Sequence, residues 1–274
     1  MIDFERLGQI FNNWNELIWA GILSTLILSI VGTVVGLLLG IPLAYGKKLH
    51  TKKYDSRFKK VLYGFVRGVC NIYSTVLRGT PMMVQALVIF YGVAYLFGTT
   101  MSTLIAGFLI VSLNTAAYMA EIIRSGLNSI DQGQIEGGRS LGLSYRQTMF
   151  KIVLPQAIKN VIPAIANELV VNIKDTSVLS VIMVTDLFYN GKLIVARWYT
   201  QFPVYFIVSI IYLIMTISLT RVLRLIEKKM NIKTKISLPI SVTDPSGFAT
   251  NELIDGKDYA SPKERRLWNG FIRN

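Results

Sequence analysis

Long stretches without a charged residue dominate the pattern of this chain. Three of them cover residues 17–46, 79–120 and 198–220. An α-helix rises about 1.5 Å per residue, so about 20 apolar residues cross the roughly 30 Å hydrocarbon core of a bilayer. The first and last stretches are therefore each long enough to cross once, and the middle one is long enough to cross twice. This pattern predicts an all-α polytopic membrane protein.

Five transmembrane helices are predicted in all. They cover residues 16–46, 82–97, 103–123, a span within 156–185, and residues 202–223. The fourth is the least regular, because Pro163 falls inside it and charged residues interrupt it. An amphipathic stretch at residues 58–77 leads into the second span.

Basic residues in the loops orient these spans. Residues 47–60 hold seven Lys and Arg residues against one acid, Asp55, and residues 124–151 and 221–235 are also more basic than acidic. Loops rich in Lys and Arg stay on the cytoplasmic side of a membrane. Five spans with the N-terminus outside place all three loops in the cytoplasm. The formal net charge of +13 is thus explained by topology, and no nucleic-acid partner is expected.

Composition agrees with a membrane domain followed by a polar extension. The chain is 52% hydrophobic and 16% charged, against about 25% charged in soluble domains. We expect residues 1–235 to form the transmembrane domain and residues 236–274 to be a weakly structured cytoplasmic tail. One cysteine and one histidine exclude a disulfide framework within the chain and make a metal centre improbable.

The loop between the third and fourth spans is the most informative segment. It runs from Glu136 past Gly142 to Leu154 and Pro155, and its pattern predicts two short helical stretches broken at Gly142. Pro155 is expected to end the second stretch before the next span. Such an element could dock a soluble partner or rest as an amphipathic helix on lipid headgroups. Periodicity alone favours the lipid interpretation.

The spacing of residues in this loop favours the docking interpretation over the lipid interpretation. Glu136, Gly142 six positions later, Ile152 ten positions after that, and then Leu154 and Pro155 resemble the EAA loop of ABC importer permeases. Gly137 and Gly138 stand where that family usually has two alanines. Glycine weakens a helix by about 1 kcal/mol relative to alanine, so a looser first turn is expected here.

Two further segments resemble the polar amino acid branch of these permeases. Arg78, Gly79, Thr80 and Pro81 are similar to its RGTP motif. A second motif of this branch, N-E followed by K-D-T-S, is similar to the segment that contains Asn167, Glu168, Lys174, Asp175, Thr176 and Ser177. The resemblance extends over roughly residues 24–229 and leaves out the tail after residue 235.

The resemblance implies a permease subunit of an importer for polar amino acids, multi-pass in the bacterial plasma membrane. A second permease subunit, in a homo- or heterodimer, two cytoplasmic ATPase subunits and an external amino-acid-binding protein are the implied partners. The ATPase-coupling residues would be Glu136, Gly137, Gly138, Gly142, Ile152, Leu154 and Pro155. The chain lacks a G-x-x-x-x-G-K-[ST] phosphate loop, so ATP and Mg²⁺ are expected on the partners. No cofactor and no enzymatic activity are expected of the chain itself.

Charges within the fourth span mark a candidate substrate site. Ionisable groups at mid-membrane are costly, so Glu168, Lys174 and Asp175 need partners or a water-filled cavity. They could form a structural ion pair, or they could meet the ammonium and carboxylate of an amino acid. In an unbroken helix Glu168 and Asp175 share a stripe, whereas Lys174 points about 120° away. All three could face one ligand only if the helix distorts or a second subunit contributes.

With the resemblance, the substrate-binding set becomes Glu168, Lys174, Asp175, Thr176 and Arg78. For Arg78 and Thr80 a structural role, as a snorkelling side chain and a helix cap, is the favoured interpretation.

Two other classes of protein fit the sequence less well. A secondary transporter driven by an ion gradient also carries charges at mid-membrane, but it commonly has more spans in inverted halves. An intramembrane enzyme would need an activated nucleophile or a metal site, and the sequence has neither H-E-x-x-H nor G-x-S-x-G. No catalytic residue and no metal ligand are therefore predicted.

Overall fold

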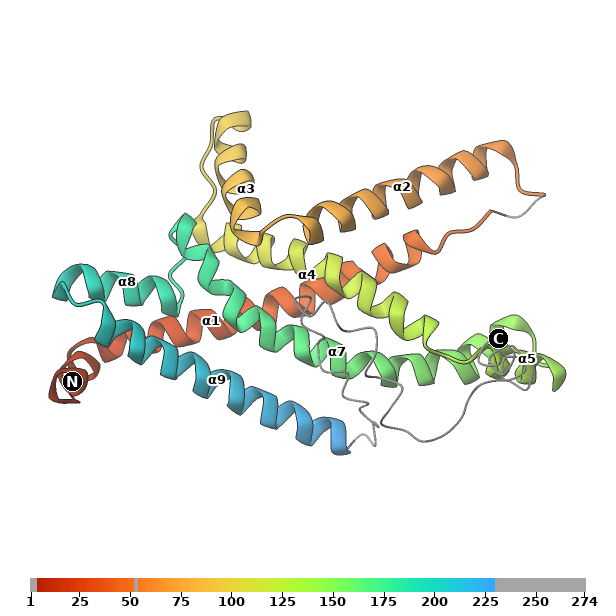
Figure 1. Cartoon of the computed structure of the whole chain (residues 1–274). Helices are drawn as coiled ribbons and strands as arrows, with labels where there is room; N and C mark the ends of the chain where they lie inside the picture. The colour runs from red at the N-terminus through yellow and green to blue at the C-terminus, as the bar shows by residue number, and fades with distance from the viewer. Residues whose placement is uncertain (1–3, 52–53, 230–274) are drawn as a thin grey trace, which may run out of the picture. The chain divides into compact units, whose positions relative to one another are not determined.

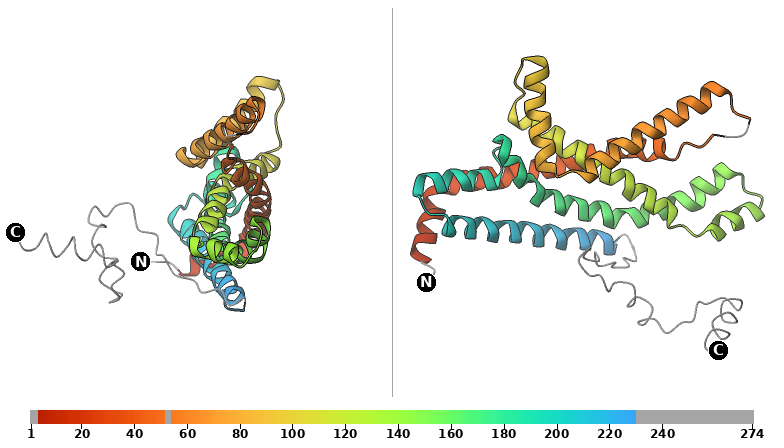
Figure 2. Two further views of the ribbon diagram at one scale, coloured as in Figure 1. Left: turned by 90° about the vertical axis from the view of Figure 1, so that its right-hand side faces the viewer. Right: turned by 45° about the horizontal axis from the view of Figure 1, so that its top comes forward.

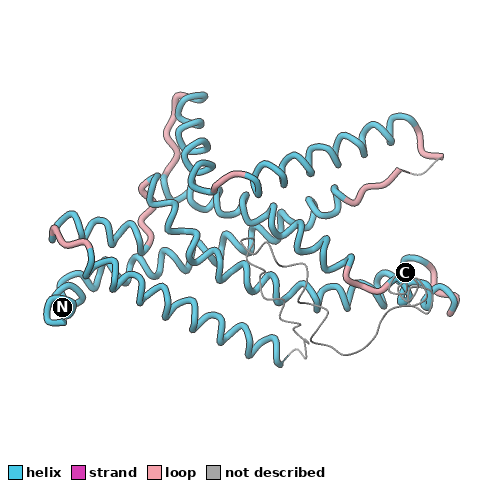
Figure 3. The backbone as a smooth tube through the Cα atoms, viewed as in Figure 1, coloured by secondary structure: helices cyan, strands magenta, loops and turns pink. Residues whose placement is uncertain are grey.

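A computed structural model describes residues 4–51 and 54–229, and within these ranges the chain is helical, without strands. The predicted tail, residues 236–274, lies outside the described residues. The helices, joined by short loops (Figure 3), are α1 (Phe4–Lys47), α2 (Arg57–Gly79), α3 (Met82–Phe97), α4 (Thr103–Asn128), α5 (Gln132–Ser140), α6 (Tyr145–Thr148), the π-helix η1 (Met149–Val153), α7 (Leu154–Asp175), the 3₁₀ helix η2 (Thr176–Ile182), α8 (Leu187–Trp198) and α9 (Phe202–Lys229).

Four segments of the described chain are long and apolar enough to cross a membrane. They are Gly8–Lys47, Thr103–Asn128, Tyr145–Ile182 and Phe202–Lys229. A fifth crossing is possible if α2 and α3, bent by 113°, count as one broken span. The helices α1, α4, α7 and α9 run along a common axis, with the α5 region at one end and α8 at the other (Figures 1 and 2). The all-helical polytopic fold is confirmed.

The second predicted span is too short to cross the membrane by itself. The bounds of α3, Met82–Phe97, match the predicted span, but these 16 residues rise only about 24 Å at 1.5 Å each. The preceding helix α2 qualifies as membrane-crossing only together with α3. The amphipathic stretch that leads into the second span is thus part of a crossing where the bent pair counts as one broken span.

Glycines spaced four residues apart let α1 approach α4 closely. A Cβ added to these glycines would overlap α4: 2.3 Å from Val111 at Gly32, 2.7 Å from Thr115 at Gly36, and 2.6 Å from Met119 at Gly40. Small residues at this spacing allow helix backbones to pack closely in membranes.

A leucine at Gly36 is expected to destabilise the bundle. The added side chain would overlap Thr115, and overpacking costs about 1–3 kcal/mol, which corresponds to a drop in Tm of about 3 °C or more. Gly64→Leu is the matched control, because a Cβ at Gly64 meets nothing within 4 Å. Thermal unfolding in detergent can be followed through the buried thiol of Cys70. An equal loss of Tm in both variants would show that the α1–α4 contact is not tight.

A buried polar triad ties three helices together inside the bundle. The Asn172 amide on α7 donates to Thr33 Oγ1 on α1 (2.8 Å) and to Thr115 Oγ1 on α4 (3.0 Å). All three side chains are buried. A buried polar group without a partner costs free energy, so this triad favours one relative position of α1, α4 and α7.

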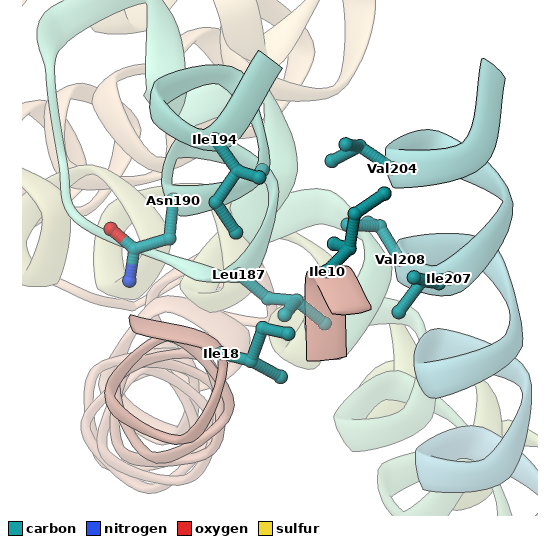
Figure 4. A pocket seen from close by; sticks show the side chains of 9 residues that line it. Ile10, Ile18, Leu187, Asn190, Ile194, Val204, Ile207 and Val208 are labelled. Atoms are coloured by element: carbon teal, nitrogen blue, oxygen red, sulfur yellow. The ribbon is translucent and has the colours of Figure 1, made fainter. Parts of the chain in front are cut away.

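The end of the bundle that carries α8 has a separate apolar core. Here the first turns of α1 pack against α8 and α9 through Ile10, Ile18, Leu187, Ile194, Val204 and Val208, which surround a void of about 10 Å³ (Figure 4). The α1 backbone is kinked at Trp14 (φ −125°, ψ 18°), and the guanidinium of Arg197 lies 4.9 Å from the Trp14 ring centroid. This kink lets α1 cap the end of the bundle.

Candidate functional site

The loop that connects α4 to α7 forms a helical hairpin. Its first arm is α5, and its second is α6 followed by η1, which continues into α7. Both arms lie beyond the end of α4, at the end of the bundle away from α8 (Figure 1). The predicted pair of helical stretches is present in the structure.

Gly142 terminates the first arm in a conformation that suits glycine. The N–H of Leu143 donates to the carbonyl of Gly138 (3.1 Å), and that of Gly142 donates to the carbonyl of Arg139 (3.0 Å). This pair of bonds is a Schellman motif, which places the residue after the helix in the left-handed region. Gly142 has φ +80°. The helix break predicted at Gly142 is thus confirmed and given a cause.

The second arm starts immediately afterwards and packs on the first. Ser144 caps α6 with a reciprocal capping box to Gln147. A Cβ added at Gly138 would lie 2.9 Å from the Thr148 side chain and 3.0 Å from that of Ile152. A Cβ at Gly137 would meet nothing within 4 Å. Of the two adjacent glycines, only Gly138 allows the close contact between the arms.

The predicted helix end at Pro155 is wrong. The chain remains helical from Tyr145 through Ile182, and Pro155 occupies the second position of α7. In η1 the N–H of Leu154 donates to the carbonyl of Met149, five residues back. We attribute the continuity to this wider turn, because proline has no N–H for the usual bond to the residue four positions earlier.

The hairpin presents an apolar and charged surface. Leu141 is 82% exposed and Phe150 is 69% exposed. Tyr145 is also exposed, as is Glu136. Exposed apolar side chains rimmed by polar groups mark protein or membrane contacts.

A second polar cluster holds the break between α2 and α3. The Gln85 side chain donates to the carbonyls of Leu77 and Thr80, both at 2.8 Å, and Asn114 of α4 donates to Gln85 Oε1 at 3.0 Å. These bonds satisfy carbonyls that lack helical partners at the end of α2. The Thr80 hydroxyl donates to the carbonyl of Val76, consistent with the structural role favoured for this residue. Gln85 and Asn114 were missed by sequence reasoning, although each is a polar residue within a charge-free stretch.

One carboxylate gathers three cations where α1, α2 and α4 meet. Glu121 of α4 pairs with Lys47 of α1, with Arg124 at 2.8 Å and with Arg78 of α2 at 3.7 Å. Burial and the charge of Arg124 lower the pKa of the neighbouring Lys48, as expected for a site with more cations than anions. Glu121 was also missed, because it lies just outside the uncharged stretch of residues 79–120 and belongs neither to the EAA-like loop nor to the two motifs of the polar amino acid branch.

The charged residues of α7 fall into two groups. Glu168 and Asp175 share the stripe predicted for an unbroken helix, and each is partly buried. The negative charge of Asp175 and the positive charge of Arg78 both act on the Glu168 carboxylate. Among the described residues, no ion pair within 4 Å joins Lys174 to either acid. A structural ion pair therefore does not explain the two carboxylates.

Lys174 faces a different part of the bundle. Its side chain lines a groove of about 390 Å³, together with Ser177, Phe188, Tyr205, Val208, Ser209 and Tyr212. These residues come from η2, α8 and α9. Thr176 is fully buried, and its hydroxyl donates to the carbonyl of Ile173 at 3.0 Å. The charges of Asp175 and Arg78 thus act on Glu168, and the charge of Lys174 acts on Asp175, whereas the Lys174 side chain lines the groove and Thr176 is buried.

A bundle of membrane-crossing helices with internal charges and a projecting helical hairpin is the architecture of a membrane-embedded transport subunit. The sequence model of the family described as "Binding-protein-dependent transport system inner membrane component" matches residues 36–232. The chain belongs to this family, whose members are the membrane permeases of ABC importers. It is thus an inner-membrane permease subunit.

Several relatives are permeases of amino acid transport systems. The chain is 32% identical to the putative glutamine transport system permease protein GlnP of Rickettsia felis, over 77% of this chain and 91% of that protein. It is 33% identical to the arginine transport system permease protein ArtQ of Bacillus subtilis, over 77% and 90%.

Solved structures agree with this assignment. A crystal structure of an amino acid ABC transporter with histidines matches with a TM-score of 0.73 and 34% identity, over 84% of this chain and 99% of that one. The inward-facing MetNI methionine ABC transporter matches in fold with a TM-score of 0.57 at 19% identity, over 76% and 95%.

Proposed function

We propose that this permease carries a polar amino acid across the membrane and that Glu168, Asp175 and Arg78 contact it. The observation that carries the proposal is the charge arrangement inside the bundle. Two carboxylates share one stripe of α7, and a guanidinium acts on one of them. Intramembrane charges of this kind mark a substrate path. The relatives named for glutamine and arginine transport support an amino acid as the substrate.

The chemistry of the three groups fits a zwitterion. The carboxylates of Glu168 and Asp175 would accept from the ammonium of the substrate, and the Arg78 guanidinium would take its carboxylate in a bidentate pair. Lys174 and Thr176 also belong to the proposed site by resemblance. The groove beside α9 supports a flanking position for Lys174, and the buried hydroxyl of Thr176 supports a role in shaping the turn from α7 to η2.

We further propose that the hairpin couples the permease to ATPase subunits in the cytoplasm. Its exposed side chains Leu141, Tyr145 and Phe150 form an apolar surface, beside which Glu136 offers a charge. Gly142 and the contact of Gly138 with Thr148 and Ile152 fix the two arms relative to each other. Leu154 and Pro155 join the hairpin without a helix break to α7, which carries Glu168 and Asp175. A force on the hairpin can therefore reach the proposed substrate site through one continuous helix.

The proposed assembly contains two permease subunits, two ATPase subunits and an external amino-acid-binding protein, with the N-terminus of this chain outside. ATP and Mg²⁺ would be bound by the ATPase subunits, and this chain would contribute no cofactor or catalytic group. Nucleotide energy would then act through movement of the hairpin.

Reconstitution into proteoliposomes tests this proposal against ion-driven transport. The permease would be purified with the ATPase and binding protein that co-purify in mild detergent. Uptake of labelled arginine and glutamine is expected to require ATP on the cytoplasmic side and to persist with a protonophore. Uptake that continues without ATP and collapses with the protonophore would favour a secondary transporter instead.

A further inference from the structure

Glu121 and Tyr118 of α4 together hold the Arg78 side chain. The Arg78 Nη1 atom lies 3.7 Å from Glu121 Oε1, and its guanidinium carbon lies 5.5 Å from the centroid of the Tyr118 ring. Residues three apart lie on the same face of a helix, so both contacts come from one surface of α4. The Arg78 side chain is 42% exposed. These two contacts, more than burial, define where its charge lies.

The ion pair between Arg78 and Glu121 is the loosest in the cluster. Arg124 makes two contacts of 2.8 Å with Glu121 Oε2, and Lys47 pairs with Oε1. A guanidinium has five N–H donors, and at 3.7 Å Arg78 has no hydrogen bond to this carboxylate. Its donors are thus available to a carboxylate of the substrate.

Without Glu121, the other carboxylates near Arg78 would compete for it. The charge of Arg78 already acts on Glu168, which in turn feels the charge of Asp175. A guanidinium released from α4 would be attracted to this pair of acids and would neutralise one of them.

We propose that Glu121 is a positioning residue for substrate binding, which holds Arg78 at the edge of the Glu168 and Asp175 site and keeps it from pairing with these acids. The inference rests on the proposed function, because it presumes that Arg78 and the two acids bind the amino acid. Glu121 itself touches no substrate in this scheme. Its effect on transport passes through Arg78.

A double-mutant cycle in the complete importer tests this role. The variants are Glu121→Gln, Arg78→Gln and the double substitution, and the probes are labelled L-arginine and L-glutamine. Glu121→Gln is expected to raise the KM of uptake about tenfold, with the maximal rate within about twofold. The double variant is expected to show no higher KM than Arg78→Gln, because coupled residues have non-additive effects.

Arg124→Gln is the matched control. It removes the tightest exposed partner of Glu121 and leaves the pair with Arg78 in place, so its KM is expected to stay within about twofold of the parent. A similar rise in KM for Arg124→Gln would mean that the cluster is only structural. If the increases in KM caused by Glu121→Gln and Arg78→Gln multiply in the double variant, the positioning role is likewise overturned.

Assembly and the proposed function are tested separately. Each variant is checked for co-purification with the ATPase subunits, and Glu121→Asp replaces Glu121→Gln in the cycle if the latter does not assemble. Aspartate keeps the charge for Lys47 and Arg124 but draws the carboxylate back by one methylene, so the KM is expected to rise in the same direction. An unchanged KM in the Glu121 variants overturns this inference alone. Normal uptake by Glu168→Gln combined with Asp175→Asn overturns the proposed function.

Discussion

Replacing Gly142 by tryptophan is expected to uncouple uptake from ATP hydrolysis while the bundle stays folded. Gly142 has φ +80° within the Schellman motif that ends α5. Left-handed backbone costs an L-residue about 1–2 kcal/mol, and the tryptophan side chain would project from a surface that we propose contacts the ATPase. Uptake should fall at least about tenfold. ATP hydrolysis by the assembled complex should continue but lose its stimulation by the loaded binding protein.

Gly137→Ala is the control for this experiment. A Cβ at this position meets nothing within 4 Å, and alanine favours the helix by about 1 kcal/mol. Its uptake is expected to equal that of the parent. Glu136→Lys, which reverses an exposed charge one residue earlier, should behave like the Gly142 variant. Normal ATP-driven uptake by the tryptophan variant would show that the hairpin does not transmit force.

Removing the two acids of α7 is expected to have the second large effect. In Glu168→Gln and Asp175→Asn the side chains keep their size and lose their charge, so packing is preserved while attraction for an ammonium is lost. A lost contact to a charged group is worth about 1.5–3 kcal/mol, which corresponds to a loss of apparent affinity of at least about tenfold for each variant. Uptake measured at increasing substrate concentration gives this affinity.

Lys174→Met tests whether Lys174 contacts the substrate together with Glu168 and Asp175 or only flanks the site. Lys174 lines the groove between η2, α8 and α9 and makes no ion pair with either acid in the described chain. Its replacement is therefore expected to cost less uptake than either acid variant. An equal loss would mean that Lys174 binds the substrate as well, for instance after a distortion of α7. If the acid variants fail to co-purify with the ATPase subunits, their charges serve assembly instead of binding.

Hydrophobic patterning and short motifs were sufficient to identify the class of protein and the elements that span the membrane. Long uncharged stretches predict membrane helices, because in lipid the backbone N–H and C=O groups must form hydrogen bonds within the same segment. Gly142 marked the break of the hairpin, since this effect depends on a missing side chain at a known position. Glu168 and Asp175 were placed on one stripe by helical geometry alone.

Which side chains contact one another depends on how the helices pack, and this could not be predicted from local pattern. Several contacts join residues that are distant in sequence. Gly36 packs against Thr115, and Asn114 hydrogen-bonds to Gln85 at the break before α3. Glu121 likewise pairs with Lys47 and Arg78. The continuity of the helix through Pro155 depends on a single wide turn that local pattern does not specify. Lys174, one residue from Asp175, lines the groove formed with η2, α8 and α9. The periodicity of a helix gives the direction of each side chain, whereas the partner on that side is set by how the helices pack.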